Sequence, residues 1–165
     1  MQKKINELLQ KSIIKKISDR NTITSIGVLS TETLSKNMDL QSLIAENFQT
    51  KNSCYLNYRT YDKKNEFSEK YFSENSFDWK GCVIDEDLKS FLGKEFDVLI
   101  TVFDQKNLYL EYTTLKSEAI FKVGIANIND SLFDLEIQTD FSDIHIYLNE
   151  VKKYLQILSK TRTNL

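Results

Sequence analysis

Residue types that build metal sites and disulfide frameworks are scarce in this chain of 165 residues. It has two cysteines, Cys54 and Cys82, far apart in the sequence, and one histidine, His145. The sequence therefore argues against a zinc site and against a disulfide framework, since each needs several suitably spaced ligands or thiols. Both cysteines lie in apolar stretches, which favours buried free thiols over catalytic or redox groups. A reducing compartment follows from this interpretation.

Proline is absent, although about 5% is typical of proteins, and only four glycines occur. The heavy use of Asn, Lys, Ile, Asp and Ser is typical of an AT-rich bacterial genome, and the missing proline is partly the same bias. Neither G-x-G-x-x-G nor G-x-x-x-x-G-K-[ST], the motifs that cradle nucleotide phosphates, is found in the chain. We therefore expect no cofactor.

Long apolar runs are missing as well. No stretch approaches the roughly 20 apolar residues of a membrane span. Lysines at positions 11, 15 and 16 interrupt the apolar core that a signal peptide would need. The formal net charge of −2 provides neither a broad basic surface for nucleic acid nor an acidic tail. These absences predict a cytoplasmic protein without a membrane span or a nucleic-acid partner.

The apolar content that is present is sufficient for a packed fold. Hydrophobic residues make up 41% of the chain and aromatic residues 12%. A disordered chain has too little apolar surface to offset the entropy of ordering. We find no linker and no internal repeat, so residues 1–165 are interpreted as one domain.

Strand and helix patterns alternate along the chain. β-branched and apolar runs predict strands over 22–29, 54–61, 77–84, 96–103, 119–125 and 132–137. Helical spacing predicts helices over 3–17, 39–48, 85–92, 107–115 and 142–159. The apolar residues that define the last two are Leu108, Tyr112 and Leu115 in the first of them and Ile144, Leu148, Val151, Leu155 and Leu158 in the second. This alternation predicts an α/β fold: a three-layer, mostly parallel open sheet of the Rossmann-like kind, with an N-terminal amphipathic helix. The polar segment 62–76 is either a functional loop or hides an element.

The N-terminal helix has an apolar stripe and a basic polar face. Residues 1–20 contain six basic and two acidic side chains. Such a helix can lie on an anionic membrane surface, which leaves peripheral membrane contact by residues 1–17 as the weaker alternative. The aromatic anchors common in membrane-surface helices are missing. Packing on the domain or on a partner is therefore favoured.

Four motifs follow one another in the second half of the chain: Phe96-x-Val98-Leu99-Ile100, Ser117-x-Ala119-x-Phe121-Lys122-Val123-Gly124, Phe133-Asp134-Leu135 and Tyr154-Leu155-x-Ile157-Leu158. In this order they resemble a bacterial family of small proteins, a domain of unknown function, whose members also begin with a lysine-rich helix. The resemblance spans nearly the whole chain and implies no activity, cofactor or catalytic residue.

A second resemblance concerns topology alone. The succession of a strand ending in a polar residue, a helix, small residues and Phe121-Lys122-Val123-Gly124-Ile125 is similar to the N-terminal half of the heptosyltransferase-like glycosyltransferases. Those enzymes need a second sugar-nucleotide domain, for which this chain has no room. The similarity implies a Rossmann-like topology and no function.

Ligands of open α/β sheets bind beyond the carboxyl ends of the strands, so polar residues after each predicted strand are candidates. Ser30 and Thr31 follow the first strand, and Asp104 follows the 96–103 strand. Hydroxyl groups at a helix start can hold a phosphate, but they also cap helices, and capping is the favoured interpretation here. Glu32, next in the chain, would oppose an anion.

The loop after the 119–125 strand is a further candidate. Asn127 and Asn129 offer polar groups there, and Lys122 lies just upstream. Asn is also a residue that builds turns without any ligand, and this alternative is favoured.

Other polar and aromatic residues are assigned structural roles. Asp134 and Glu136 lie on one face of a predicted strand, which is typical of the wet face of an edge strand. His145 is interpreted as a partly exposed structural residue at a helix start. Trp79 is expected to cover the sheet or join the core, in preference to forming an exposed recognition patch. No catalytic residue is identified.

Two functions follow from this pattern. The leading hypothesis is a non-catalytic α/β module for protein interaction or self-association, with a protein partner or a second copy of the chain. The alternative is a binding protein for a nucleotide- or sugar-like molecule, or a small enzyme, that uses the carboxyl ends of the strands. Convergence of Ser30, Asp104, Lys122 and Asn127 in one pocket would support this alternative, and their scattering over the surface would count against a site built from them.

Overall fold

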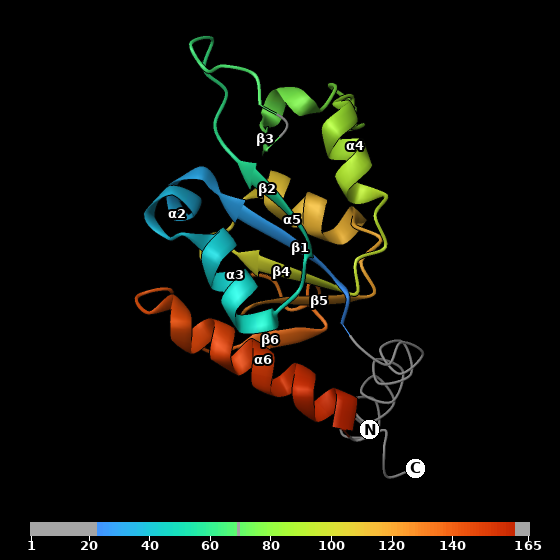
Figure 1. Ribbon diagram of the computed structural model, residues 1–165. Helices are drawn as coiled ribbons and strands as arrows, with labels where there is room; N and C mark the ends of the chain where they lie inside the picture. The colour runs from blue at the N-terminus through green and yellow to red at the C-terminus, as the bar shows by residue number, and fades with distance from the viewer. Residues whose placement is uncertain (1–22, 69, 161–165) are drawn as a thin grey trace.

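The computed structural model describes residues 23–68 and 70–160, and its centre is a twisted sheet of six strands (Figure 1). The strands are β1 (Ser25–Thr31), β2 (Asn52–Tyr58), β3 (Tyr71–Phe72), β4 (Val98–Val102), β5 (Phe121–Ile125) and β6 (Leu135–Ile137). All pairs are parallel, in the order β3-β2-β1-β4-β5-β6. This is a strand order of doubly wound sheets and confirms the predicted α/β open sheet.

Five α-helices and one 3-10 turn lie between or after the strands in the described ranges. They are α2 (Glu32–Asn37), α3 (Leu40–Phe48), η1 (Glu74–Ser76), α4 (Glu86–Leu92), α5 (Leu108–Lys116) and α6 (Ile144–Lys160). In Figure 1, α3 and α6 lie together on one face of the sheet, and α5 passes behind it. The predicted helix over 3–17 lies outside the described residues.

Side-chain oxygens fix the starts of the short helices. Thr31 caps α2, Asp39 caps α3, Asp85 caps α4 and Asn107 caps α5, each by accepting a hydrogen bond from a backbone N–H of the first turn. These bonds satisfy donors that a helix start leaves without a partner. The predicted capping after the first strand is thus confirmed at Thr31.

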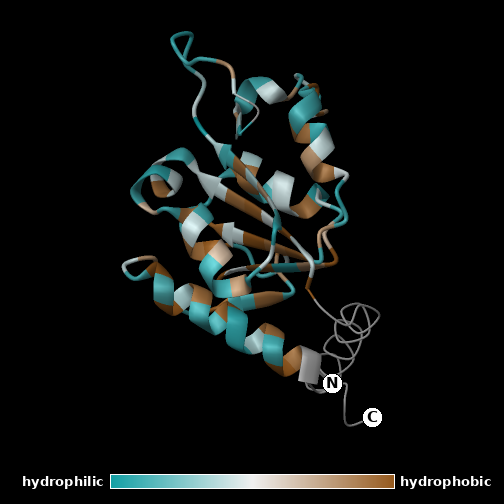
Figure 2. Cartoon of the chain, viewed as in Figure 1, coloured by the Kyte–Doolittle hydropathy of each residue, from teal (hydrophilic) through white to brown (hydrophobic). Residues whose placement is uncertain are grey.

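Apolar burial is greatest where the sequence is most continuously apolar. All five residues of β4 are buried, as expected for a strand covered on both faces. The predicted stripe of α6 is confirmed, because Ile144, Leu148, Val151 and Leu155 are buried. Figure 2 shows apolar residues on the central strands and at intervals along α6. One hydrophobic cluster joins the sheet to its helices.

The prediction failed between residues 62 and 84. Segment 62–76 contains β3 and η1, which sequence analysis missed, and the predicted strand over 77–84 is wrong. Phe77 and Val83 form only an isolated antiparallel bridge around a turn. Trp79 is 90% exposed there instead of covering the sheet, and Cys82 is an exposed free thiol instead of a buried one. The bridge is too short to bury both sides of the segment.

The buried face of α5 also differs from the prediction. Leu108 is 75% exposed and Leu115 61% exposed, while Leu110, Thr113 and Thr114 are buried. The hydroxyl of Thr114 donates to the Leu110 carbonyl at 2.8 Å, which allows a polar side chain to face the sheet. A threonine pair therefore occupies a surface that the hydrophobic pattern assigned to leucines.

Candidate functional site

An open pocket of about 500 Å³ lies at the carboxyl ends of β1 and β2. Its lining residues come from three turns that follow parallel strands: Thr31, Glu32, Thr33, Tyr58, Arg59, Thr60, Tyr61, Asp62, Asn65 and Asn107. We call this the carboxyl-edge pocket. It borders the point where the strand order reverses between β1 and β4, which is where open α/β sheets bind ligands.

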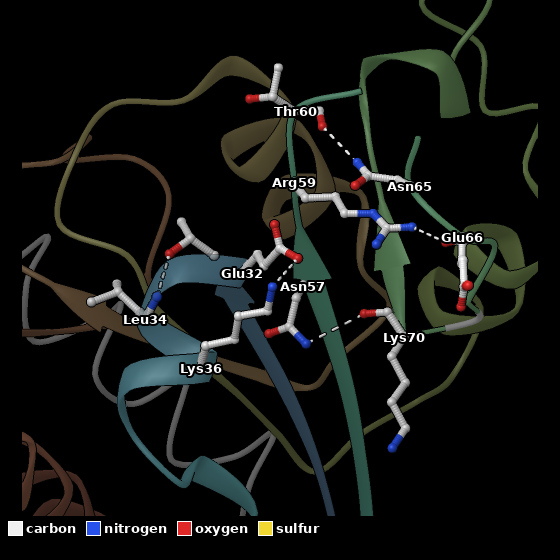
Figure 3. Close-up of polar contacts among 10 residues, drawn as sticks. Glu32, Leu34, Lys36, Asn57, Arg59, Thr60, Asn65, Glu66 and Lys70 are labelled. Atoms are coloured by element: carbon white, nitrogen blue, oxygen red, sulfur yellow. Dashed lines mark hydrogen bonds and ion pairs between the residues drawn. The ribbon is translucent and has the colours of Figure 1, made fainter. Parts of the chain in front are cut away.

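The turn from β1 into α2 forms one wall. The Thr31 Oγ1 accepts a hydrogen bond from the Leu34 backbone N–H at 3.2 Å, which leaves its own proton able to donate (Figure 3). The Glu32 carboxylate pairs with the Lys36 Nζ at 2.8 Å, and this bond raises the pKa of Lys36. The wall therefore presents hydroxyl groups and a carboxylate, without the glycine turn of a dinucleotide site.

The segment after β2 forms the opposite wall, and Arg59 holds it in place. The Arg59 guanidinium donates to the Glu66 carbonyl and lies 4.5 Å from the centre of the Tyr71 ring. The Asn65 Nδ2 donates to the Thr60 carbonyl at 3.4 Å, as Figure 3 shows. These contacts fold residues 59–66 back on themselves, so that Asp62 and Asn65 face the same pocket as β1.

Tyr58 and Glu74 join the pocket to neighbouring aromatic rings, because the Tyr58 ring contacts Phe72 and Tyr109. The Tyr58 hydroxyl donates to the Glu74 Oε2 at 3.2 Å, and the Glu74 Oε1 accepts from the Tyr61 backbone N–H at 3.1 Å. The Tyr58 ring stacks on Tyr109 with centroids 5.7 Å apart. Burial, followed by the Glu74 charge, raises the pKa of Tyr58, so its hydroxyl stays protonated near neutral pH.

The chemistry of the lining is that of polar binding. Two carboxylates, Glu32 and Asp62, face one guanidinium, Arg59, whose donors are partly used by the wall itself. The lining has no histidine, cysteine or lysine. Hydroxyl, amide and carboxylate groups at short range can exchange hydrogen bonds with a ligand that both donates and accepts them.

Of the six candidate ligand residues, all of which the structure describes, only Thr31 lines this pocket. Ser30 is fully buried and its Oγ donates to the Val102 carbonyl at 3.0 Å, which joins β1 to β4. Asp104 is exposed after β4. Lys122 is the second residue of β5, near the amino edge of the sheet, and its Nζ donates to the Leu115 carbonyl at 3.0 Å.

Asn127 and Asn129 build the turn after β5. Asn127 is exposed and has a φ of 67°, a left-handed conformation that asparagine tolerates well. The Asn129 Oδ1 accepts from the Ser131 backbone N–H at 3.2 Å, and its Nδ2 donates to the Glu111 Oε2 at 3.0 Å. The structure therefore does not bring the six candidates together.

Other candidate groups stand apart from the pocket. His145 is exposed at the start of α6, and its backbone N–H donates to the Asp143 carboxylate at 2.9 Å. Cys54 is a half-buried free thiol. Burial, together with the Asp130 charge, raises the pKa of Glu136 on the edge strand β6. Residues 23–68 and 70–160 contain no cluster of three or more potential metal ligands.

Sequence analysis missed most of the pocket because it extended the second strand to residue 61. The strand ends at Tyr58, so Arg59 and Thr60 belong to the carboxyl edge and to the strand-end rule that found Thr31. The unusual length of the unassigned segment 62–76 was the available signal. It marked the region that supplies Asp62 and Asn65.

Fold and pocket together define a doubly wound α/β protein with a polar pocket at the carboxyl edge of its sheet. A family model described as "Family of unknown function (DUF6913)" matches residues 1–158, and the chain belongs to this family. The resemblance to a family of unknown function is thus confirmed. Neither the curated proteins nor the solved structures yielded a match. Within the described ranges, no helix is both long and apolar enough to cross a membrane.

Proposed function

We propose that the carboxyl-edge pocket binds a small, neutral, hydroxyl-rich molecule of the sugar or nucleoside class. The observation that carries this proposal is the convergence of three polar turns on one pocket where parallel sheets bind ligands. Threonine hydroxyls and asparagine amides of the lining match alternating donors and acceptors on such a molecule. Tyr61, which is 48% exposed, offers a ring on which a sugar or base can stack.

The charges of the pocket disfavour a phosphorylated ligand. Asp62 would repel a phosphate, the Lys36 cation is already engaged by Glu32 at 2.8 Å, and the donors of Arg59 are partly engaged by the Glu66 carbonyl and the Tyr71 ring. Helix α2 has only six residues, so its dipole offers little compensation. A neutral ligand meets none of this repulsion.

Saturation-transfer NMR against a panel of free nucleosides, monosaccharides and their phosphates tests the proposal. We expect at least one neutral compound to bind and its phosphate to bind more weakly. Tyr61→Ala should weaken binding about tenfold, in keeping with the 1–3 kcal/mol of a base–aromatic stack. Tyr154→Ala, at an exposed position of α6, is the matched control and should bind normally. Equal loss in both variants, or tighter binding of the phosphates, would count against the pocket.

Self-association is a second candidate function, and the exposed apolar residues of segment 77–84 favour it. Trp79 is 90% exposed and Ile84 54% exposed, within a turn held by Asp78, whose carboxylate accepts from the backbone N–H groups of Lys80 and Cys82. Large exposed aromatic side chains on a turn held by hydrogen bonds are typical of binding surfaces.

The free thiols Cys54 and Cys82 support a further proposal, that the protein works in a reducing compartment such as the cytoplasm.

Sedimentation velocity over a range of concentrations tests this second candidate. The natural chain should form dimers at micromolar concentration, and Trp79→Ser should remain monomeric. Phe67→Ser, at another highly exposed aromatic residue, is the matched control and should leave the dimer intact. A monomeric natural chain at all concentrations would exclude self-association through this segment.

A further inference from the structure

The amino half of β2 is an open sheet edge. On the side away from β1, β3 pairs only with Asn57 and Tyr58, because β3 has two residues and β2 has seven. Residues 52–56 have no strand on this side within the described part of the chain. The sheet thus has an incomplete edge beside its longest pairing, β1 with β2.

The backbone groups that face the open edge follow from the pairing pattern. The Asn57 N–H donates to the Lys70 carbonyl at 2.9 Å, and the Arg59 N–H donates to the Phe72 carbonyl at 3.0 Å. Alternate residues of a strand direct their backbone groups to the same side. Ser53 and Tyr55 therefore direct their N–H and C=O groups to the open edge, while Cys54 and Leu56 direct theirs to β1.

Lysine side chains border this edge on both faces of the sheet. A pocket of about 470 Å³ runs along it, and no carboxylate is found among its described lining residues, which are Gln41, Ala45, Thr50, Lys51, Ser53, Cys54, Tyr55 and Lys70. Figure 3 shows the Lys70 side chain extending alongside the amino half of β2, away from β3. The Lys94 Nζ donates to the Cys54 Sγ at 3.4 Å. The edge is therefore basic, and among the described residues the edge-facing backbone groups of Ser53 and Tyr55 have no strand partner.

The opposite edge of the sheet is different. Strand β6 has three residues, one of which is Glu136, and Asp134 stands just before it. Short length and charge are the usual means of blocking strand addition at an edge. In β2 the residues Ser53-Cys54-Tyr55-Leu56 carry no charge and favour extended structure.

We propose that the amino half of β2 binds an extended, acidic peptide segment of another protein, which adds to the sheet as a strand in line with β3. Ser53 and Tyr55 supply the backbone hydrogen bonds, and Lys51, Lys70 and Lys94 attract the carboxylates. Strand addition of this type gains affinity from the main chain and specificity from side chains beside the edge. A second copy of the chain fits poorly, because pairing two such edges would bring their lysines together. The site is separate from the carboxyl-edge pocket and does not depend on it.

Peptide binding followed by fluorescence anisotropy tests the proposal directly. The ligand is a fluorescein-labelled octapeptide of alternating Glu and Val with blocked ends, and two controls accompany it. One has the same sequence with N-methyl groups on alternate residues, which remove the donors of one edge, and the other replaces Glu with Lys. The natural chain should bind the first peptide at least tenfold more tightly than either control.

Two variants test whether the peptide binds at the open edge of β2. Ser53→Pro removes one edge-facing N–H and leaves the bonds to β1 intact, since proline is tolerated at edge positions. It should weaken peptide binding at least tenfold with an unchanged circular dichroism spectrum. Lys51→Glu combined with Lys70→Glu should have a similar effect without altering the backbone, and decides the matter if Ser53→Pro fails to fold. The matched control, Lys152→Glu with Lys153→Glu on α6, should bind normally.

Amide hydrogen exchange by NMR distinguishes strand addition from simple charge attraction. On saturation with the acidic peptide, the Ser53 and Tyr55 amides should exchange at least tenfold more slowly, while Cys54 and Leu56 stay unchanged. Binding without this alternation, or equal binding of the N-methylated peptide, would overturn the proposal. So would a dimer of the free chain that Ser53→Pro dissociates, because the edge would then belong to a second copy.

Discussion

Tyr147 shows how one buried hydroxyl group ties α6 to the sheet. Its side chain is fully buried, and its hydroxyl donates to the Thr101 carbonyl of β4 at 2.8 Å. The Thr101 Oγ1 in turn donates to the Val123 carbonyl of β5 at 3.0 Å. Burial raises the pKa of Tyr147 well above its usual 10.0. The native state therefore holds this residue in its protonated form.

Replacing this hydroxyl should remove a loss of stability that the natural protein suffers at alkaline pH. At pH 7, Tyr147→Phe should lower the free energy of unfolding by about 1 kcal/mol, the net worth of one hydrogen bond. Above pH 10 the unfolded chain releases the tyrosine proton and the native chain does not, so the natural protein loses stability that the variant keeps. The difference between the two proteins should therefore shrink as pH rises from 9 to 11 in urea unfolding. Tyr154→Phe, at an exposed position, should show no such trend.

Gly124 makes room for an aromatic ring on the sheet. A Cβ at this position would lie 2.2 Å from the Phe133 ring, whereas one at Gly93 would meet nothing closer than 3.5 Å. Gly124→Ala should lower the free energy of unfolding by about 1–3 kcal/mol, the usual cost of overpacking. Gly93→Ala is the control and should be close to neutral. If the clash is the cause, Phe133→Leu should recover part of the loss in a double variant, and equal losses in both backgrounds would refute it.

Residues of the candidate site were predictable only where a strand end was predictable. Thr31 was found because β-branched residues lead directly into a capped helix. Arg59 was missed because the second strand was predicted to run to residue 61, and sequence spacing does not reveal its contacts with Glu66 and Tyr71. Lys122 was misplaced for the opposite reason: a polar residue near a strand can lie at its amino end, where a backbone carbonyl takes its bond.

At the scale of elements, α4 depends on a single carboxylate. The Asp85 Oδ1 accepts from the Asp87 and Leu88 backbone N–H groups, both at 3.0 Å, and its Oδ2 accepts from the Ser76 hydroxyl at 2.9 Å. This residue therefore caps α4 and also fastens η1 to it. Both elements are too short to be stable alone.

Asp85→Ala should lower the free energy of unfolding by about 1–2 kcal/mol, the upper range for a helix cap. Amide exchange should accelerate in η1 as well as in α4, because the Ser76 contact is lost with the cap. Asp39→Ala removes the cap of α3, which holds only Ser42, and serves as the control with the smaller effect. A change confined to α4 would show that Ser76 does not couple the two elements.

Regular elements were predictable because their signals are local. Apolar patterns and capping side chains located five of the six strands and four of the helices within a few residues. The region 62–84 has no such signal, since β3 is two residues long and its pairing with Asn57 and Tyr58 is a matter of tertiary structure. Trp79 was wrongly predicted to cover the sheet, because large aromatic side chains are usually buried and this one is exposed.

At the scale of the whole molecule, β2 connects two independent sites. Its carboxyl end leads into the carboxyl-edge pocket, and its amino half forms the open, basic edge. Sequence order alone does not place them on one strand, because Lys70 and Asn65 are close in the chain but line different pockets. The two pockets are separated along β2, because one lies at its carboxyl end and the other beside its amino half.

The central place of β1 has a consequence for how the chain is made. During synthesis β2 becomes available to residues 25–31 well before Val98–Val102, the partner of the other edge of β1, has been made. Until then, an apolar strand containing Ile26, Val28 and Leu29 has one edge without a partner. Nascent chains that stop between these two pairings expose a surface prone to aggregation, so folding during synthesis should depend on protection of this single strand.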